Sequence, residues 1–124
     1  MRLAKILVLE DDPTRLQGFV IGLKGMDYTL VSNPIMAVGY LALYDWDVLF
    51  LDHDLGGNAF CPSDEKSGFA VACWLSENPT HVPGKIVIHS WNPAGVENMQ
   101  AVLQAYNVYV EQYKDAQRVR ELVG

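Results

Sequence analysis

The sequence predicts an α/β fold in which five parallel strands form one sheet covered by helices on both faces. Strand patterns and helix patterns alternate five times along the 124 residues. The strand segments are short apolar runs without polar alternation, as expected for strands that are buried on both faces. Acidic residues or histidines directly follow three of these runs, and open α/β sheets place their ligand sites at the carboxyl ends of strands.

The predicted strands are brief segments rich in valine, isoleucine and leucine, bounded by polar residues, proline or glycine. Their shortness and continuous apolar character favour strands over helices. They cover residues 5–9, 28–31, 47–51, 85–88 and 108–110.

Each of the first two helices is expected to begin with a proline, whose fixed backbone suits a first helical position. The first begins at Pro13 and is expected to stop near Gly25. The second begins at Pro34 after Asn33, which is a good N-cap residue. The apolar stripes at helical spacing are Leu16, Phe19, Val20 and Leu23 in the first helix, and Ile35, Val38, Leu41 and Ala42 in the second.

Three further helices complete the alternation, over residues 68–77, 93–104 and 115–123. A polar, glycine-containing loop from about 55 to 67 precedes the first of these, which ends at Asn78-Pro79. Right-handed crossovers leave few topologies for such a chain. The flavodoxin-like strand order 2-1-3-4-5 is favoured because it brings the ends of strands 1, 3 and 4 together. We expect a single domain over residues 1–124.

The net charge, hydrophobicity and cysteine content of the chain exclude several classes of function. The net charge of −6 argues against a protein that grips a nucleic-acid backbone along its length. No apolar run reaches the roughly 18 residues of a membrane span, and no signal peptide is visible, so we expect a cytoplasmic protein without a membrane partner. Two cysteines are too few for a disulfide framework or a four-ligand zinc site.

Carboxylate, imidazole and hydroxyl side chains follow three of the predicted strands. If these strands are parallel neighbours, five carboxylates and two imidazoles surround one crevice, and such a group of like charges favours a bound cation. The segments are Glu10-Asp11-Asp12, Asp52-His53-Asp54 and His89-Ser90.

The carboxylates predict a site for Mg²⁺ or Mn²⁺, which prefer oxygen ligands. Asp52 and Asp54 are two residues apart, so on an extended strand end their side chains point the same way. Asp11 or Asp12 would complete the site. Glu10 should face away from Asp11 by strand alternation, so either Glu10 with Asp12, or Asp11 alone, faces the crevice.

The two histidines and the serine are candidates for catalysis. His89 is predicted to do acid–base work, and neighbouring carboxylates are expected to raise its pKa and favour an acid role. His53 should project to the opposite face, where ligation of the metal, a structural role and a substrate contact all remain open. Ser90 could contact a phosphate oxygen.

With these motifs in view, the chain resembles the response-regulator receiver domain over nearly its whole length. In that family an acidic pair follows strand 1, a phospho-accepting aspartate ends strand 3, and a threonine or serine ends strand 4. Those positions fall on Asp11 and Asp12, on Asp52 and on Ser90. Receivers also carry a lysine at the end of strand 5, where this chain has Glu111.

Where the chain differs from ordinary receivers, it resembles a smaller group, the cyclic-phosphate processing receiver-like domains. The similarity lies in the segment Asp-His-Asp-Leu-Gly-Gly at 52–57 and in the segment Ile-His-Ser-Trp-Asn-Pro at 88–93. Gly95 and Met99 continue it into the fourth helix. The resemblance implies metal-dependent processing of cyclic phosphates, such as the 2′,3′-cyclic ends left by RNA cleavage.

Four functions stay open at this point. The first is a metal-dependent phosphodiesterase that acts on a phosphorylated small molecule or nucleic-acid end. The second is a receiver phosphorylated at Asp52 by a histidine kinase, and the third is a module that senses a nucleotide or phosphate without turnover. The fourth is a Toprim-like nuclease or primase fragment. The fourth helix, fifth strand and fifth helix could also form a homodimer, as they do in receivers.

Overall fold

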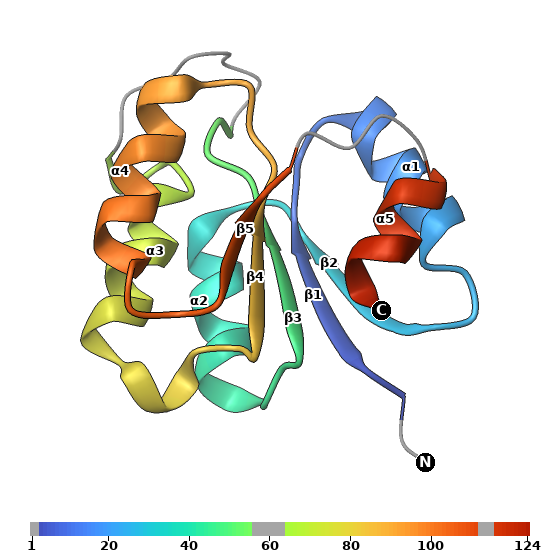
Figure 1. The fold of residues 1–124 in the computed structure, drawn as a ribbon, viewed down its shortest axis with the longest axis horizontal. Helices are drawn as coiled ribbons and strands as arrows, with labels where there is room; N and C mark the ends of the chain where they lie inside the picture. Colours follow the sequence, from blue (N-terminus) through green and yellow to red (C-terminus); the bar gives the residue numbers. More distant parts are fainter. Residues whose placement is uncertain (1–2, 56–63, 112–115) are drawn as a thin grey trace.

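The computed structural model describes residues 3–55, 64–111 and 116–124. Strands and helices alternate along the chain as expected (Figure 1). The elements are β1 Lys5–Leu9, α1 Pro13–Gly22, β2 Asp27–Val31, α2 Pro34–Leu43, β3 Val48–Leu51, α3 Phe69–Glu77, a 3₁₀ turn Pro79–His81, β4 Lys85–Ile88, α4 Pro93–Leu103, β5 Val108–Val110 and α5 Ala116–Val123.

The strands form one parallel sheet in the order β2-β1-β3-β4-β5, which confirms the predicted topology. Leu9 of β1 pairs with Leu51 of β3, and Leu51 pairs with Ile88 of β4. The residues that follow these three strands therefore emerge at the same edge of the sheet. This register brings the predicted site residues into one neighbourhood.

Helices cover both faces of the sheet (Figure 1). One apolar core lies under α2, α3 and α4, and it includes Leu49 and Leu51 of β3. The other lies under α1 and α5, and it includes Val48 and Phe50. Alternate residues of the same strand thus enter opposite cores, as the strand period of two requires. The buried, unalternating strand sequences follow from this arrangement.

Three helices begin with an Asx residue followed by proline. The side chains of Asp12, Asn33 and Asn92 accept hydrogen bonds from backbone N–H groups three residues later, at 2.9, 2.9 and 3.0 Å. These bonds satisfy N–H groups that have no partner inside the helix. Because α1 and α4 start directly after site strands, their caps also fix the chain beside the site.

The predicted apolar stripe of α2 is partly wrong. Ile35 is 83% exposed and Ala42 is also exposed, whereas Ala37 and Leu41 are fully buried. Almost all residues of α2 are apolar, so the sequence could not show which face turns inward. In α1, Phe19 and Leu23 are buried as expected, but Val20 is 43% exposed.

Helix ends and loops differ slightly from the predictions. The helix of α1 ends at Gly22, and Gly25 lies in the following turn with a φ of +87°, a conformation that glycine adopts without strain.

No helix in the described parts of the chain is long and apolar enough to cross a membrane. Gly56 and Gly57, which end the Asp-His-Asp-Leu-Gly-Gly segment, lie outside the described residues.

Candidate metal and phosphate site

Three buried side chains meet where β1, β3 and β4 end. A carboxylate oxygen of Glu10, one of Asp52 and a ring nitrogen of His89 all lie within 4.8 Å of one another. The three residues are 0%, 1% and 3% exposed. Within the described residues, the candidate ligands Asp11, Asp12 and Asp54 are not part of this group. The inward carboxylate from the first acidic segment is therefore Glu10.

Arg15 supplies the positive charge of this cluster. Its Nε donates to Oε1 of Glu10 at 2.6 Å and its Nη2 lies 3.4 Å from Oδ2 of Asp52. Burial lowers the pKa of Arg15, but the hydrogen bond and charge of Glu10 outweigh it and raise the pKa overall. Arg15 lies in the first turn of α1, so the helix that Asp12 caps delivers the guanidinium to the strand ends.

Burial and the nearby charge of Glu10 raise the pKa of Asp52 to about 8, although Arg15 acts in the opposite direction. A backbone N–H of His53 also donates to Oδ1 of Asp52 at 2.8 Å. Two carboxylates held this close favour an added proton or an added cation. The site is thus arranged to accept positive charge.

The expected rise in the pKa of His89 is wrong. Burial, followed by the charge of Arg15, lowers the pKa of His89 to about 3. Its Nδ1 lies 3.5 Å from Oε1 of Glu10, and its ring packs edge-on against Phe19 at a centroid distance of 5.1 Å. A neutral imidazole in this position can act as a ligand or a proton acceptor, and its predicted acid role stays a prediction.

Asp11 and Asp12 occupy less central positions than Glu10. Both of their backbone N–H groups donate to Oε2 of Glu10, at 2.9 and 3.0 Å, so the turn after β1 wraps around that carboxylate. Oδ2 of Asp12 accepts the N–H of Arg15 as the helix cap. Strand alternation failed here because β1 ends at Leu9 and the chain turns at once.

A second cluster lies on the other side of β3 and joins the segment at 52–57 to the segment at 88–93. Nδ1 of His53 lies 2.8 Å from Oδ1 of Asp54, and Nδ2 of Asn92 donates to the same oxygen at 3.0 Å. His53 is fully buried, as expected for a side chain opposite Asp52. The expectation that Asp52 and Asp54 share a direction fails, because Asp52 contacts α1 while Asp54 contacts the cap of α4.

Two glycines make room for this arrangement. A Cβ atom on Gly68 would lie 1.7 Å from the carbonyl oxygen of Asp52, and one on Gly95 would lie 2.5 Å from the ring of His53. The N–H of Gly68 also donates to the carbonyl oxygen of His53 at 2.9 Å. Glycine is needed at both positions for space, not for an unusual backbone angle.

Ser90 and Glu111 complete the edge of the sheet. Ser90 is 2% exposed, and its Oγ accepts the N–H of Asn92 at 3.2 Å. Glu111 follows β5, where a receiver would have a lysine, and it pairs with Arg118 through two contacts of 2.9 Å. The hydrogen bond and charge of Arg118 lower the pKa of Glu111.

Sequence reasoning missed Arg15 and gave Gly95 no physical role. The signal for Arg15 was its position three residues after the helix cap, which turns a side chain back toward the strand end. The signal for Gly95 was its spacing from Asn92, which places it in the first turn of α4 beside the loop after β3.

The sheet order and the strand-end acidic site define the receiver class of fold. The structure is similar to a response regulator protein from Burkholderia pseudomallei with a phosphorylated aspartic acid, calcium ion and citrate (14% identity, TM-score 0.69, 98% of this chain and 66% of that one). It is also similar to a response regulator from Thermotoga maritima in complex with Mg²⁺-BeF (19%, 0.67, 96% and 95%). A third similar structure is the signal receiver domain of a histidine kinase from Syntrophus aciditrophicus (23%, 0.68, 97% and 89%).

Within this class, residues 5–105 match the family model described as the cyclic-phosphate processing receiver domain. The chain belongs to that family. No curated protein matches the sequence.

Proposed function

We propose that the protein is a divalent-metal-dependent phosphodiesterase that opens cyclic phosphates, with the cluster of Glu10, Asp52 and His89 at its centre. The observation that carries the proposal is the convergence of three buried ligand atoms within 4.8 Å at the strand ends. Family membership supports cyclic phosphates as the substrate class.

The donor set fits a divalent cation. Glu10 and Asp52 offer carboxylate oxygens, and the imidazole of His89 is neutral, as a ligand must be. A site with one nitrogen among oxygens suits Mn²⁺ better than Mg²⁺, because Mg²⁺ strongly prefers oxygen. When bound, such a cation polarises the phosphate and lowers the pKa of a water molecule.

The chain's own groups would then hold the substrate. In the reaction, water adds to phosphorus, one ester P–O bond breaks, and the released oxygen takes up a proton to leave a phosphate monoester. Ser90 follows His89 at the end of β4, a position from which its hydroxyl group can contact a phosphate oxygen. Arg15 can stabilise the negative charge that develops on the phosphate, since its guanidinium already faces Asp52.

Phosphorus NMR of a 2′,3′-cyclic nucleotide incubated with protein and Mn²⁺, and then with chelator before the spectrum, tests the activity. We expect conversion to one monoester isomer, and no conversion by Asp52→Asn. If the wild-type protein converts no cyclic phosphate but binds one saturably, the protein senses the ligand without turnover, and the enzyme proposal is wrong.

A Mn²⁺ titration combined with the same turnover assay distinguishes two roles for His89. If His89 is a metal ligand, His89→Ala should weaken Mn²⁺ binding at least tenfold, as measured by calorimetric titration. If His89 instead acts as an acid, the same variant should lower turnover and keep nearly the wild-type affinity for Mn²⁺.

A second candidate function is phosphorylation of Asp52, because Asp52 follows β3 and lies beside the end of β4 as in receivers. Receiver domains act with histidine kinases in signalling, and the similar domain from Syntrophus aciditrophicus is itself part of a signal transduction histidine kinase. The acidic Glu111 after β5 disfavours this function. Incubation with acetyl phosphate followed by intact-mass measurement tests it, and stable labelling that Asp52→Asn abolishes would support it.

A further inference from the structure

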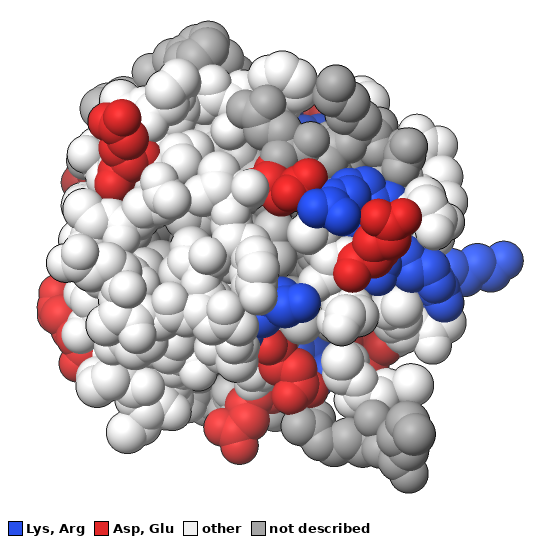
Figure 2. Space-filling model, viewed as in Figure 1, with Lys and Arg blue, Asp and Glu red and all other residues white. Residues whose placement is uncertain are grey.

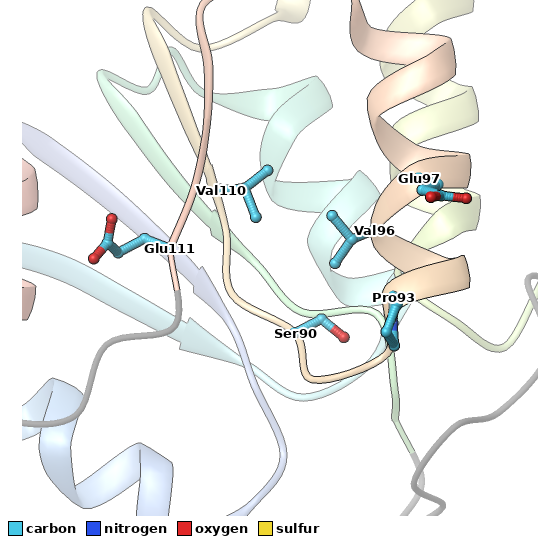
Figure 3. A pocket seen from close by; sticks show the side chains of 6 residues that line it. All are labelled: Ser90, Pro93, Val96, Glu97, Val110 and Glu111. Carbon is cyan, nitrogen blue, oxygen red and sulfur yellow. The ribbon is translucent and has the colours of Figure 1, made fainter.

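A pocket of about 460 Å³ lies between α4 and β5. Figure 3 shows Val96 and Val110 facing each other across it, with Ser90 and Pro93 at one end. Its volume lies in the range of small-molecule sites in proteins. The lining residues are Ser90, Pro93, Val96, Glu97, Val110 and Glu111.

Ser90 connects this pocket to the acidic cluster. It directly follows His89, and β4 lies between β3 and β5 in the sheet. The N–H of His89 donates to Leu51 at 3.1 Å and that of Glu111 donates to Ile88 at 2.9 Å, so the three strand ends are held in line. Neighbouring strands lie ~4.8 Å apart, so the ends of β3 and β5 are about 10 Å apart. The cluster faces α1 and the pocket faces α4, so a ligand that reaches both must pass over the end of β4 beside Ser90.

The chemistry of the pocket favours a flat, weakly polar group. Two valines form opposite walls (Figure 3), and the surface over α4 in Figure 2 is uncharged apart from isolated acidic side chains. Glu97 and Glu111 lie on the outer sides of the pocket (Figure 3). Arg118 offsets the charge of Glu111, so the repulsion of an additional phosphate group comes mainly from Glu97, which would also favour N–H donors at the edge of a ring.

We propose that this pocket binds the base of a nucleoside cyclic phosphate whose phosphate lies at the cluster of Glu10, Asp52 and His89. The pocket therefore selects mononucleotides with one phosphate over RNA ends that carry further phosphates. This inference rests on the proposed function, because it assigns the remainder of the same substrate.

A substitution that fills the pocket tests the base site. Val110 is 42% exposed, so Val110→Trp adds volume without disturbing the core. For cytidine 2′,3′-cyclic phosphate we expect the KM to rise about tenfold, and for glycerol 1,2-cyclic phosphate, which lacks a base, to change less than twofold. Val20→Trp on α1 is the matched control, since Val20 is 43% exposed and lies outside the pocket.

The charge argument has its own test. A dinucleotide that ends in the same cyclic phosphate should bind the wild-type protein several-fold more weakly than the mononucleotide. Glu97→Lys on the exposed side of α4 should remove most of that difference. An unchanged difference would overturn the preference for a single phosphate.

A binding measurement separates the pocket from the chemistry. Titration of the wild-type protein with cytidine alone, followed by valine methyl NMR, should shift the Val96 and Val110 signals saturably. Absence of these shifts, or an equal effect of Val110→Trp on both cyclic phosphates, would overturn the base site while leaving the proposed activity intact. Shifts without any turnover would instead refute the activity and support the pocket.

Discussion

Asp52 and His53 are neighbours in the chain, but the structure surrounds them in opposite ways. Asp52 meets a second carboxylate, and burial raises its pKa to about 8. His53, on the other side of β3, has hydrogen-bonding neighbours in Asp54 and Asn92 at 2.8 and 3.4 Å. The comparison indicates that the first side accumulates negative charge, whereas the second side holds the loop in place.

The difference also has an energetic meaning. Like-charged buried carboxylates cost stability until a cation or proton arrives, whereas a hydrogen-bonded network with close glycine contacts stabilises one loop conformation. The site thus combines a cluster that is unfavourable without an added cation or proton with a hydrogen-bonded frame that keeps it in place. Substitutions on the two sides should therefore change stability in opposite directions.

The largest effect is expected on the rigid side. Gly68→Ala places a Cβ atom 1.7 Å from a backbone oxygen, which cannot be relieved by a side-chain rotation. We expect it to lower the free energy of unfolding by more than ~4 kcal/mol. Urea unfolding measures the effect, and Gly39→Ala, where nothing lies within 4 Å, should instead be neutral or stabilising. Equal behaviour of the two variants would contradict the steric role of Gly68.

On the charged side, Asp52→Asn should stabilise the metal-free protein, on the order of 2–4 kcal/mol at pH 8. The folded pKa of Asp52 is raised from 3.8 to about 8, so the wild-type protein loses stability as the pH rises through this range. The advantage of the variant should therefore grow from pH 4 to pH 8. Thermal unfolding at several pH values measures it.

Metal addition should reverse the order. Mn²⁺ binds the folded wild-type protein and stabilises it in proportion to the logarithm of the metal concentration, and chelator should remove this gain. Asp52→Asn should gain little. If both proteins gain equally, Asp52 is not a ligand.

A smaller effect is expected for Gly95→Ala, because its Cβ would lie 2.5 Å from a side-chain ring that can shift. We expect a loss of ~2 kcal/mol in stability. The double variant with His53→Ala should lose less than the sum of the two single variants, as a double-mutant cycle measures. Additive losses would show that His53 and Gly95 are not coupled.

The smallest effect distinguishes capping from ligation at Asp12. Asp12→Ala removes the cap of α1 and should cost ~1 kcal/mol, with a smaller loss for Asp12→Asn. Mn²⁺ affinity should stay within about twofold of wild type in both, because Asp12 lies outside the close group of ligand atoms. A tenfold loss of affinity would instead make Asp12 a ligand, as the sequence had suggested.

The fold could be predicted from the sequence because short buried strands, helix caps and prolines are local signals. Asn92 and Asp12 each mark a helix start through residue type alone. The site could be predicted only as a neighbourhood, since strand alternation stops at Leu9 and Leu51 and the next residues follow turns. The inward direction of Glu10, the contact of Arg15 and the pKa of His89 depend on packing between distant elements.

His53 and Gly95 are 42 positions apart in the sequence, but their close approach means that evolution cannot change one without affecting the other. A descendant that replaces the glycine by any larger residue must also give up or reposition the histidine. Across related chains the two positions should therefore change together, whereas Ile35 on the outer face of α2 should vary independently of both. The pair would serve as a marker for chains that retain the same loop geometry even after their ligand-binding carboxylates have changed.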